Sequence, residues 1–232
     1  MLQAGLHNLR QASVRITEVS PRDGLQHESE FVPTLRKIAL INALSRTGVT
    51  EIEAGSFVSP AAIPQLADSD EVLRAIDRIP GVTYSALVPN ERGLERARAA
   101  GVDKIAVFTA ASNSFTRHNI KATVQESLVR FRPIVAAAKR DGMAVRAYLS
   151  TVVFCPYEGR IAPTQVRDVM ERLLDLAVDD ISLGETVGKA SPTDIRRLLD
   201  TVLPHVEPAR LSLQFHDADG MAVANALTAW RD

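Results

Sequence analysis

Short runs of β-branched and other apolar residues alternate along this chain with longer stretches in which apolar residues recur every three or four positions. The short runs are typical of buried strands, and the longer stretches are typical of helices that bury one face. In the fifth such stretch Val166, Val169, Met170, Leu173 and Leu174 form an apolar stripe. The pattern predicts seven strands, at residues 14–19, 50–54, 83–88, 104–108, 144–151, 180–183 and 210–215. It predicts helices between them, at residues 34–46, 70–78, 91–100, 124–139, 163–176 and 191–202.

Residues that begin and end helices support this division. Ser191 can cap a helix, Pro192 suits its first turn, and Asp194 lies near the positive end of the helix dipole. Glycine, which tolerates the left-handed conformation that ends many helices, stands between a helical pattern and the next strand at Gly48, Gly101 and Gly142. Because no linker or low-complexity segment interrupts the alternation, we expect residues 1–232 to form one α/β domain with a parallel sheet.

The periodicity alone does not separate a closed barrel from an open, doubly wound sheet. The polar residues that follow the strands favour the barrel, because its carboxyl strand ends converge on one mouth, where barrel enzymes carry their chemistry. In an open sheet the same residues would spread along an edge. These residues are Arg22, Asp23, Glu53, Ser112, Asn113, Glu185, His216 and Asp217. The sequence therefore predicts an α/β fold of the (β/α)8 TIM-barrel class.

Composition excludes several classes of partner. The 232 residues carry 27 basic and 28 acidic side chains, a net charge of -1 without basic clusters, so neither nucleic acid nor an anionic membrane is an expected partner. No apolar run approaches the roughly 20 residues of a membrane helix, and the first fifteen residues lack the apolar core of a secretory signal. Cys155 is the single cysteine, which fits a reducing compartment and a buried structural thiol. We expect a cytoplasmic protein.

Five motifs carry a resemblance to a known family. They are residues 18–26 (EVSPRDGLQ), 52–60 (IEAGSFVSP), 155–159 (CPYEG), 181–188 (ISLGETVG) and 215–217 (FHD). In this order and spacing the chain resembles the hydroxymethylglutaryl-CoA lyases. These enzymes belong to a barrel group that includes isopropylmalate and citramalate synthases and the transferase domain of pyruvate carboxylase. The second and third motifs point to the lyase branch.

The resemblance implies a metal-dependent retro-Claisen cleavage of 3-hydroxy-3-methylglutaryl-CoA, or a similar 3-hydroxyacyl-CoA, into acetyl-CoA and acetoacetate or an analogous keto acid. Such a reaction needs a base for the hydroxyl proton and a positive group beside the enolate oxygen. By motif position Arg22 resembles the arginine that stabilises the enolate, and Glu53 resembles a carboxylate close to metal and substrate. Asp217 is expected to orient His216. The resemblance also implies a homodimer and a role in leucine or related branched-chain breakdown.

The resemblance also implies a site for a divalent cation, Mg²⁺ or Mn²⁺. Asp23 resembles its carboxylate ligand, and His216 resembles one of two histidines that stand two residues apart on a strand and so face the same side. The first histidine is replaced here by Gln214. An amide oxygen suits Mg²⁺, but we expect this replacement to weaken metal binding.

A second departure concerns the predicted substrate pocket. Glu185 stands where the lyases carry an aspartate, and the extra methylene displaces its carboxylate by about 1.5 Å, the length of one carbon–carbon bond. Either the pocket has shifted to fit a different acyl group, which we favour, or turnover is poor, because a misplacement of about 1 Å can cost about 100-fold in rate. The predicted substrate-binding residues are Gln26, Ser56, Phe57, Ser112, Asn113, Ser182, Glu185 and Thr186.

Two alternative functions remain open. An acyltransferase of the same barrel group would run the reverse, Claisen condensation, although residues 155–159 argue against it. A degenerate or truncated barrel would bind a ligand without turnover. The chain ends at Asp232, within the helix that follows the seventh strand, so we expect an incomplete barrel of about seven units with an unclosed edge. By resemblance, the eighth unit carries a glycine-rich loop with a cysteine and an asparagine metal ligand.

Overall fold

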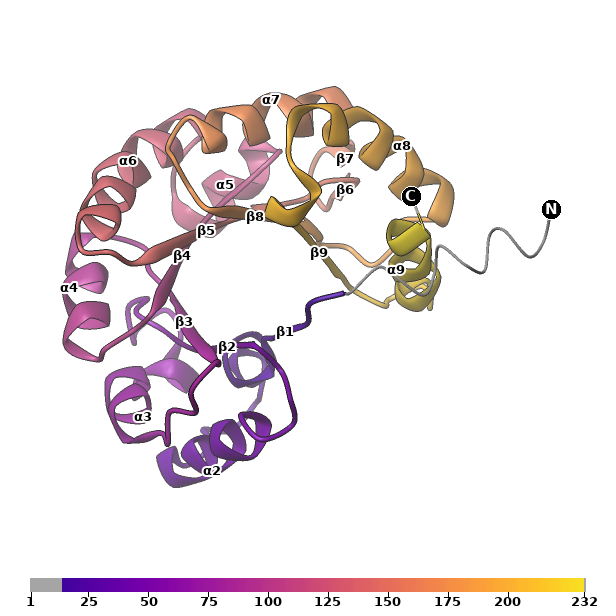
Figure 1. The fold of residues 1–232 in the computed structure, drawn as a ribbon. Coiled ribbons are helices and arrows are strands. Elements are labelled where there is room, and N and C mark those ends of the chain that lie inside the picture. Colours follow the sequence, from indigo (N-terminus) through magenta and orange to yellow (C-terminus); the bar gives the residue numbers. More distant parts are fainter. Residues whose placement is uncertain (1–13, 232) are drawn as a thin grey trace.

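Seven parallel strands form a curled sheet whose order is β1-β2-β3-β4-β5-β8-β9, so each strand lies beside the next large strand in the chain (Figure 1). The computed structural model describes residues 14–231. The strands are β1 (Thr17–Glu18), β2 (Glu51–Ser56), β3 (Thr83–Leu87), β4 (Lys104–Ala110), β5 (Ala144–Ser150), β8 (Asp180–Glu185) and β9 (Leu211–Phe215). All seven predicted strands are confirmed, although β1 is shorter than expected.

Helices cover the outer, convex side of the sheet (Figure 1). They are α2 (Thr34–Leu44), α3 (Ser69–Ala75), α4 (Glu91–Ala99), α6 (Val124–Arg140), α7 (Pro163–Leu174), α8 (Pro192–Val202) and α9 (Ala222–Arg231). The six predicted helices are confirmed. The predicted start of α8 is confirmed in detail, because Ser191 and Asp194 form a reciprocal capping box before Pro192. Gly101, with a φ of 68°, ends α4 in the left-handed conformation.

Several short elements have no counterpart in the predicted pattern. They are the π-helical turn η1 (Ser20–Gly24), the 3₁₀ turns η2 (Pro64–Leu66), η3 (Leu203–His205) and η4 (Pro208–Arg210), the helix α5 (Asn113–Ile120), and a hairpin of β6 (Phe154–Cys155) and β7 (Gly159–Arg160). Each is too short for an apolar period to reveal it. The turn η1 follows β1 closely and places Arg22 and Asp23 at the mouth of the barrel.

The hydrophobic core lies between the sheet and the outer helices. Strand residues such as Val107 and Leu149 are fully buried, as are helix residues such as Ile134 and Leu198. The predicted stripe on α7 is buried at Val166, Val169, Met170 and Leu173, and Leu174 is partly buried. Among residues 14–231 no helix is long and apolar enough to cross a membrane.

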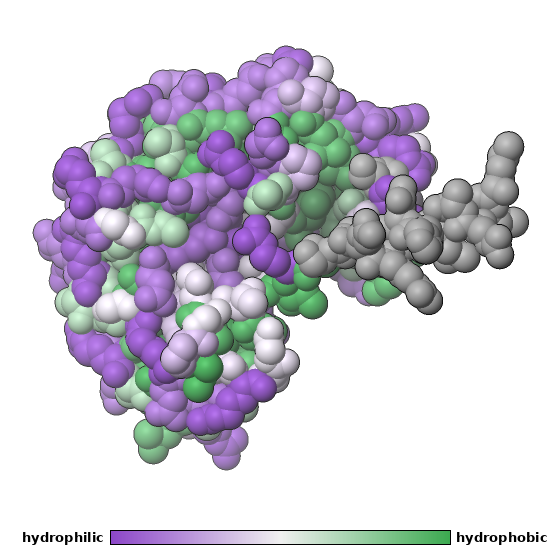
Figure 2. Space-filling model, in the orientation of Figure 1, coloured by the Kyte–Doolittle hydropathy of each residue, from purple (hydrophilic) through white to green (hydrophobic). Residues whose placement is uncertain are grey.

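The curl of the sheet brings its two end strands toward each other. Within residues 14–231, β1 pairs only with β2, and β9 pairs only with β8. Arg15 nevertheless donates to the carbonyl of Ala209 at 2.9 Å, and Gln214 on β9 reaches Asp23 beyond β1. The described chain is therefore an incomplete TIM barrel, as predicted. Figure 2 shows hydrophilic residues over most of the outer face and hydrophobic ones toward the side between the first and last strands.

Candidate active site

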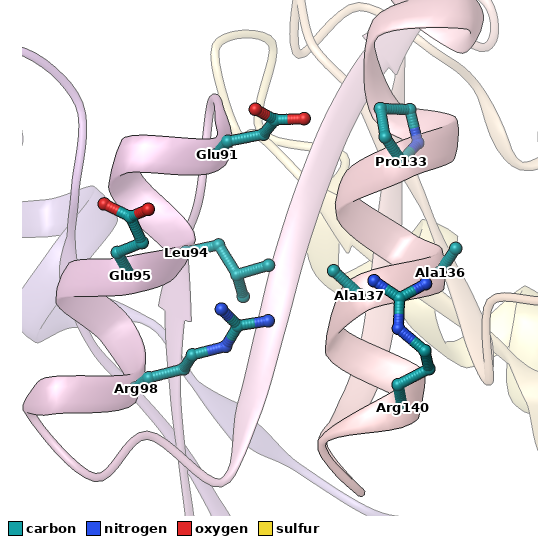
Figure 3. A pocket seen from close by; sticks show the side chains of 8 residues that line it. All are labelled: Glu91, Leu94, Glu95, Arg98, Pro133, Ala136, Ala137 and Arg140. Atoms are coloured by element: carbon teal, nitrogen blue, oxygen red, sulfur yellow. The ribbon is translucent and has the colours of Figure 1, made fainter.

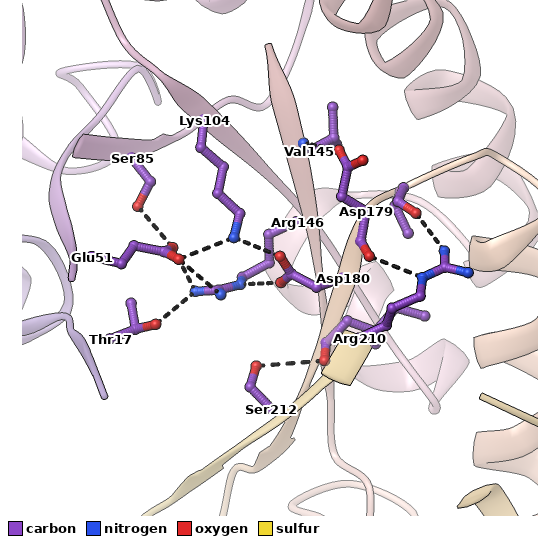
Figure 4. A network of polar contacts seen from close by, with 12 residues as sticks. Thr17, Glu51, Ser85, Lys104, Val145, Arg146, Asp179, Asp180, Arg210 and Ser212 are labelled. Atoms are coloured by element: carbon purple, nitrogen blue, oxygen red, sulfur yellow. Dashed lines mark hydrogen bonds and ion pairs between the residues drawn. The ribbon is translucent and has the colours of Figure 1, made fainter. Parts of the chain in front are cut away.

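Charged side chains fill the amino-terminal floor of the barrel. Glu51, Lys104, Arg146 and Asp180 come from four different strands and are mostly buried (Figure 4). Lys104 Nζ lies 3.0 Å from Glu51 Oε2 and 2.5 Å from Asp180 Oδ2. Arg146 donates through Nη1 to Glu51 Oε1 at 2.8 Å and through Nε to Asp180 Oδ1 at 2.5 Å. Two cations therefore neutralise two carboxylates, and all four carboxylate oxygens have a partner. We call these four residues the floor tetrad.

A second charged cluster lies nearer the carboxyl ends of the strands. The turn η1 begins with Ser20-Pro21 and buries Arg22, which is 7% exposed. Arg22 donates through Nε and Nη2 to a single oxygen of Glu53, Oε2, at 2.9 and 2.7 Å. Its Nη1 donates to Asp23 Oδ1 at 2.6 Å. Burial alone would lower the pKa of Arg22, but the charges of Glu53 and Asp23 outweigh it and raise that pKa.

Tyr148 on β5 is a further hydrogen-bond donor to Glu53. Its hydroxyl donates to Glu53 Oε2 at 2.9 Å, and the Arg22 guanidinium carbon lies 5.6 Å from its ring centroid. Burial, followed by the charge of Glu53, raises the pKa of Tyr148. Glu53 is fully buried, and its other oxygen, Oε1, has no hydrogen-bond partner among residues 14–231. The sequence analysis missed Tyr148; the signal was its position two residues after Arg146, on the same face of β5.

The predicted metal ligands occupy the same side of the molecule. Gln214 Nε2 donates to Asp23 Oδ2 at 2.8 Å, so both oxygens of Asp23 have partners within the chain. The ring Nδ1 of His216 lies 2.8 Å from the carbonyl oxygen of Glu185. Because a carbonyl only accepts, Nδ1 carries the hydrogen of this contact, which makes Nε2 the ring nitrogen that could bind a ligand.

One predicted contact differs from the one observed, and one predicted pocket residue has a local partner. Asp217 was expected to orient His216, but its Oδ1 accepts from the amide of Ala222 at 2.8 Å, at the start of α9, and the Glu185 carbonyl orients the imidazole instead. The carboxylate of Glu185 accepts from the amide of Gly188 at 2.7 Å. That carboxylate therefore holds the loop after β8. The reason is local: both acids are followed by turns whose amides need acceptors.

Several predicted pocket residues also have local partners. Ser112 caps α5, and Asn113 accepts from the amide of Val124. Phe57 is 2% exposed in the outer core, where the Arg96 guanidinium lies 5.1 Å from its ring centroid. These contacts fix the shape of the barrel rim, and a direct role toward substrate stays a prediction.

The other predicted pocket residues lie on or just beyond the strands of the barrel. Ser182 is the register partner of Tyr148 across β5 and β8, and it is 4% exposed. Thr186 accepts from the amide of Thr151 at 2.8 Å. Ser56 is buried at the end of β2, and Gln26 is partly buried after η1. Ser182 is thus the member of this group nearest in register to the Glu53 cluster.

Cys155 is a buried structural thiol, as predicted. It is 3% exposed, and its Sγ lies 3.0 Å from Ser112 Oγ and accepts from the amide of Tyr157 at 3.4 Å. These contacts join the β6–β7 hairpin to the start of α5.

A shallow groove on the outer surface is separate from this chemistry. It runs between α4 and α6, where Figure 3 shows Glu91, Glu95 and Arg98 facing Pro133 and Arg140. Its acids and arginines belong to two helices on the convex side. The groove therefore contains none of the residues that gather inside the barrel.

A divalent cation at this site would take its donors from Asp23, His216 and Gln214. Among residues 14–231 no three His, Cys, Asp or Glu side chains gather as a metal-binding group. Asp23 offers a carboxylate, and His216 offers its imidazole Nε2. Gln214 points its amide nitrogen at Asp23, so it must turn its amide to offer oxygen. The residues fit a cation that accepts mixed oxygen and nitrogen donors, on condition of that rotation.

Comparison with known proteins identifies the family. The family model described as HMGL-like matches residues 13–232. The chain belongs to this family. As an HMGL-like protein it is 47% identical over 216 residues to the mitochondrial hydroxymethylglutaryl-CoA lyase of Bos taurus. The match covers 93% of this chain and 66% of that protein, so the chain spans just under two thirds of the relative's length.

Solved structures agree with the family assignment. The HMGL-like chain superposes on the HMG-CoA lyase from Brucella melitensis with a TM-score of 0.91 and 49% identity, covering 93% of this chain and 76% of that one. It superposes on the HMG-CoA lyase from Acenitobacter baumannii with a TM-score of 0.90 and 38% identity, covering 94% and 71%. The latter structure contains coenzyme A and 3-methylmalate. The predicted family resemblance is confirmed.

Proposed function

We propose that this HMGL-like chain is a carbon–carbon lyase that cleaves 3-hydroxy-3-methylglutaryl-CoA, or a close 3-hydroxyacyl-CoA, to acetyl-CoA and acetoacetate or its analogue. The observation that carries the proposal is the buried Glu53 carboxylate, whose Oε1 lacks a hydrogen-bond partner among residues 14–231 and lies beside the charged Arg22. Leaving a buried carboxylate oxygen without a hydrogen bond costs about 1–3 kcal/mol, a cost that a donor from a bound substrate would remove. The relatives named as lyases support the same chemistry.

The reaction divides among the chain's own residues. The substrate hydroxyl donates its proton, its oxygen becomes the ketone, and the electrons of the broken carbon–carbon bond form the enolate of acetyl-CoA. Glu53 Oε1 is the acceptor for the hydroxyl hydrogen. Arg22 uses three of its five N–H groups within the chain, and the remaining two are donors for the enolate oxygen. A proton must then return to the enolate carbon.

We assign the cation site to Asp23, His216 and Gln214. Bound there, a divalent cation would acidify the substrate hydroxyl. Gln214 contributes through its amide oxygen after rotation, and its present hydrogen bond to Asp23 competes with that rotation. Mg²⁺ suits this set best, since two of the three side-chain donors are oxygen. Asp217 and Glu185 support the site indirectly, through the turns that carry and flank His216.

The remaining expectations belong to the same proposal. A CoA thioester substrate is supported by the coenzyme A in the Acenitobacter baumannii relative. We further propose a homodimer in the cytoplasm, with leucine or related branched-chain breakdown as the pathway. The bovine relative is named as mitochondrial, so localisation of a tagged chain in its own cell tests the compartment.

The deciding experiment measures acetoacetate release from 3-hydroxy-3-methylglutaryl-CoA by the folded chain, with Mg²⁺ and then with EDTA. Release that depends on Mg²⁺ supports the lyase. A folded chain that releases nothing, but binds CoA thioesters by calorimetry, would instead fit a barrel that binds without turnover. Incubation with acetyl-CoA and a keto acid tests for the condensing acyltransferase, which would join the two and release free CoA when water hydrolyses the thioester of the condensed product.

A further inference from the structure

The carboxylate of Glu53 is bonded asymmetrically. Arg22 Nε, Arg22 Nη2 and the Tyr148 hydroxyl all donate to Oε2, at 2.9, 2.7 and 2.9 Å. Oε1 is buried and has no partner among residues 14–231. The same three donors could satisfy the whole group if they were shared between the two oxygens. The asymmetry therefore needs a cause.

Arginine and carboxylate side chains have a more usual arrangement. The guanidinium fork normally places two N–H groups on two different oxygens, in parallel. The last torsion of a glutamate is broad and two-fold, so Glu53 could reach that arrangement by a small rotation. Both oxygens would then have a partner, and neither would be left for a ligand. Arg22 by itself thus favours a Glu53 carboxylate with both oxygens occupied, so that neither could accept a hydrogen bond from a substrate.

Tyr148 is the element that opposes this rotation. Its hydroxyl reaches Oε2 from β5, on the wall opposite β2, and turning the carboxylate toward the usual fork would lose that hydrogen bond. Its ring is 8% exposed and packs with Leu87 and Ala106. Burial and the Glu53 charge raise the pKa of Tyr148, so the phenol keeps its proton and remains a donor. Two residues earlier on the same face, Arg146 is held by Glu51 and Asp180 of the floor tetrad (Figure 4).

We propose that Tyr148 is a positioning residue that keeps Oε1 of Glu53 free for the reacting hydroxyl. It acts through Glu53 and need not touch the substrate. The inference rests on the proposed function, since the identity of the reacting group comes from it. Removing the hydroxyl should let Glu53 close on Arg22, which lowers turnover more than substrate binding.

The test compares Tyr148→Phe with Tyr84→Phe. Tyr84 is the matched control, because it is also buried and its hydroxyl also has partners, Ser45 Oγ at 2.9 Å and the amide of Ile79 at 3.0 Å, in the outer core. We expect Tyr148→Phe to lower kcat about 10- to 100-fold, since a catalytic group misplaced by about 1 Å loses on that order, with KM changed by less than about threefold. Tyr84→Phe should leave both constants at the wild-type level. A Tyr148→Phe enzyme with wild-type kcat overturns the proposal.

Two further measurements keep the outcome clear. The Arg22 Nε–H signal in a ¹⁵N spectrum, assigned with Arg22→Lys, should shift in Tyr148→Phe and stay in place in Tyr84→Phe. This signal needs no substrate, so a wild-type chain without lyase activity would refute the proposed function while the positioning role is still decided by the shift. If phenylalanine prevents folding, a ring-fluorinated tyrosine at position 148 keeps the volume and the donor. Wild-type turnover is then expected, and a deep loss contradicts the proposal.

Discussion

The interior of the barrel holds two buried charged clusters that differ in one respect. On the floor, Glu51 and Asp180 present four carboxylate oxygens, and each has a partner from Lys104 or Arg146. Near the mouth, Glu53 shares Arg22 with Asp23 and keeps one oxygen unpaired within the described part of the chain. The two glutamates stand two residues apart on β2 and face the same side. Strand position therefore does not explain the difference.

The difference separates a structural role from a functional one. A neutral tetrad with every oxygen paired joins β2, β4, β5 and β8 and requires nothing further, so it serves the fold. A buried oxygen without a donor is a cost that the fold does not need. Two adjacent layers of the barrel interior thus contain the same residue types, one in a structural role and the other in a functional role. Substitutions on the floor should therefore change stability, and substitutions at the mouth should change turnover.

The largest effect is expected from Glu53→Gln. An amide keeps the volume but presents a weak acceptor and a nitrogen that cannot take a proton. Loss of a general base costs about 100- to 10,000-fold in rate, and we expect a fall of kcat in that range. Acetoacetate release at saturating 3-hydroxy-3-methylglutaryl-CoA measures it. A kcat within a fewfold of wild type would remove Glu53 from the mechanism.

Glu51→Gln is the matched substitution on the floor. It leaves Lys104 and Arg146 with one carboxylate between them, and breaking a buried ion pair costs about 3–5 kcal/mol. We expect the free energy of unfolding to fall by that order in urea, with kcat of the folded protein unchanged. Asp77→Asn is the control, since its ion pair with Arg46 is exposed and contributes less than about 1 kcal/mol. Equal losses of kcat in Glu51→Gln and Glu53→Gln would abolish the distinction between floor and mouth.

Gln214→His tests the proposed cation site at the mouth. Histidine removes the amide that now donates to Asp23 and adds a nitrogen ligand, so we expect Mn²⁺ affinity to rise about tenfold or more, on the scale of changes near metal sites. Paramagnetic resonance of free Mn²⁺ measures the dissociation constant without turnover. Ala99→His, on the exposed face of α4, controls for a surface imidazole. Unchanged affinity would show that Gln214 neither competes with the cation nor limits it.

The sequence predicted these layers unequally. The strands, the main helices and the mouth residues Arg22, Asp23 and Glu53 follow from periodicity and motif position. The floor tetrad was not predicted, because its members are isolated charges at strand starts whose partners lie far apart in the chain. In the sequence, Tyr148 looks like any other aromatic residue of a buried strand, because its partner Glu53 lies on β2, far away in the chain.

The local contacts of Asp217 and Glu185 have a common physical origin. Both residues were assigned by motif position, and each carboxylate accepts from a backbone amide of the turn that follows it. Motif position predicts where a residue lies along the chain. Nearby backbone amides that need an acceptor determine which atoms its carboxylate oxygens contact. For Arg22 and Glu53, whose side chains meet from different elements, motif position was sufficient to place both residues at the mouth of the barrel.

The smallest effect is expected at the partly buried capping box of α8, which lies outside the barrel interior and gives a baseline for both interior clusters. Burial opposes the charge of Asp194, but hydrogen bonds from Ser191 and the ion pair with Arg160 outweigh it and lower the pKa of Asp194. A lowered folded-state pKa contributes stability above the unfolded value, about 3.9, and loses it as the pH falls through the folded value. Ser191→Ala should therefore lower the free energy of unfolding by about 1 kcal/mol at neutral pH, and by less below about pH 4.

Urea titrations of wild type, Ser191→Ala and the neighbouring exposed Thr193→Ala measure this difference across the acid range. Thr193→Ala should match wild type at every pH. If Ser191→Ala cost as much as Glu51→Gln, a helix cap would equal the paired charges of the barrel floor, and the floor tetrad would contribute no more than an ordinary local contact. A cost near 1 kcal/mol that fades in acid sets the floor tetrad, whose ion pairs join four strands, apart from a cap within one helix.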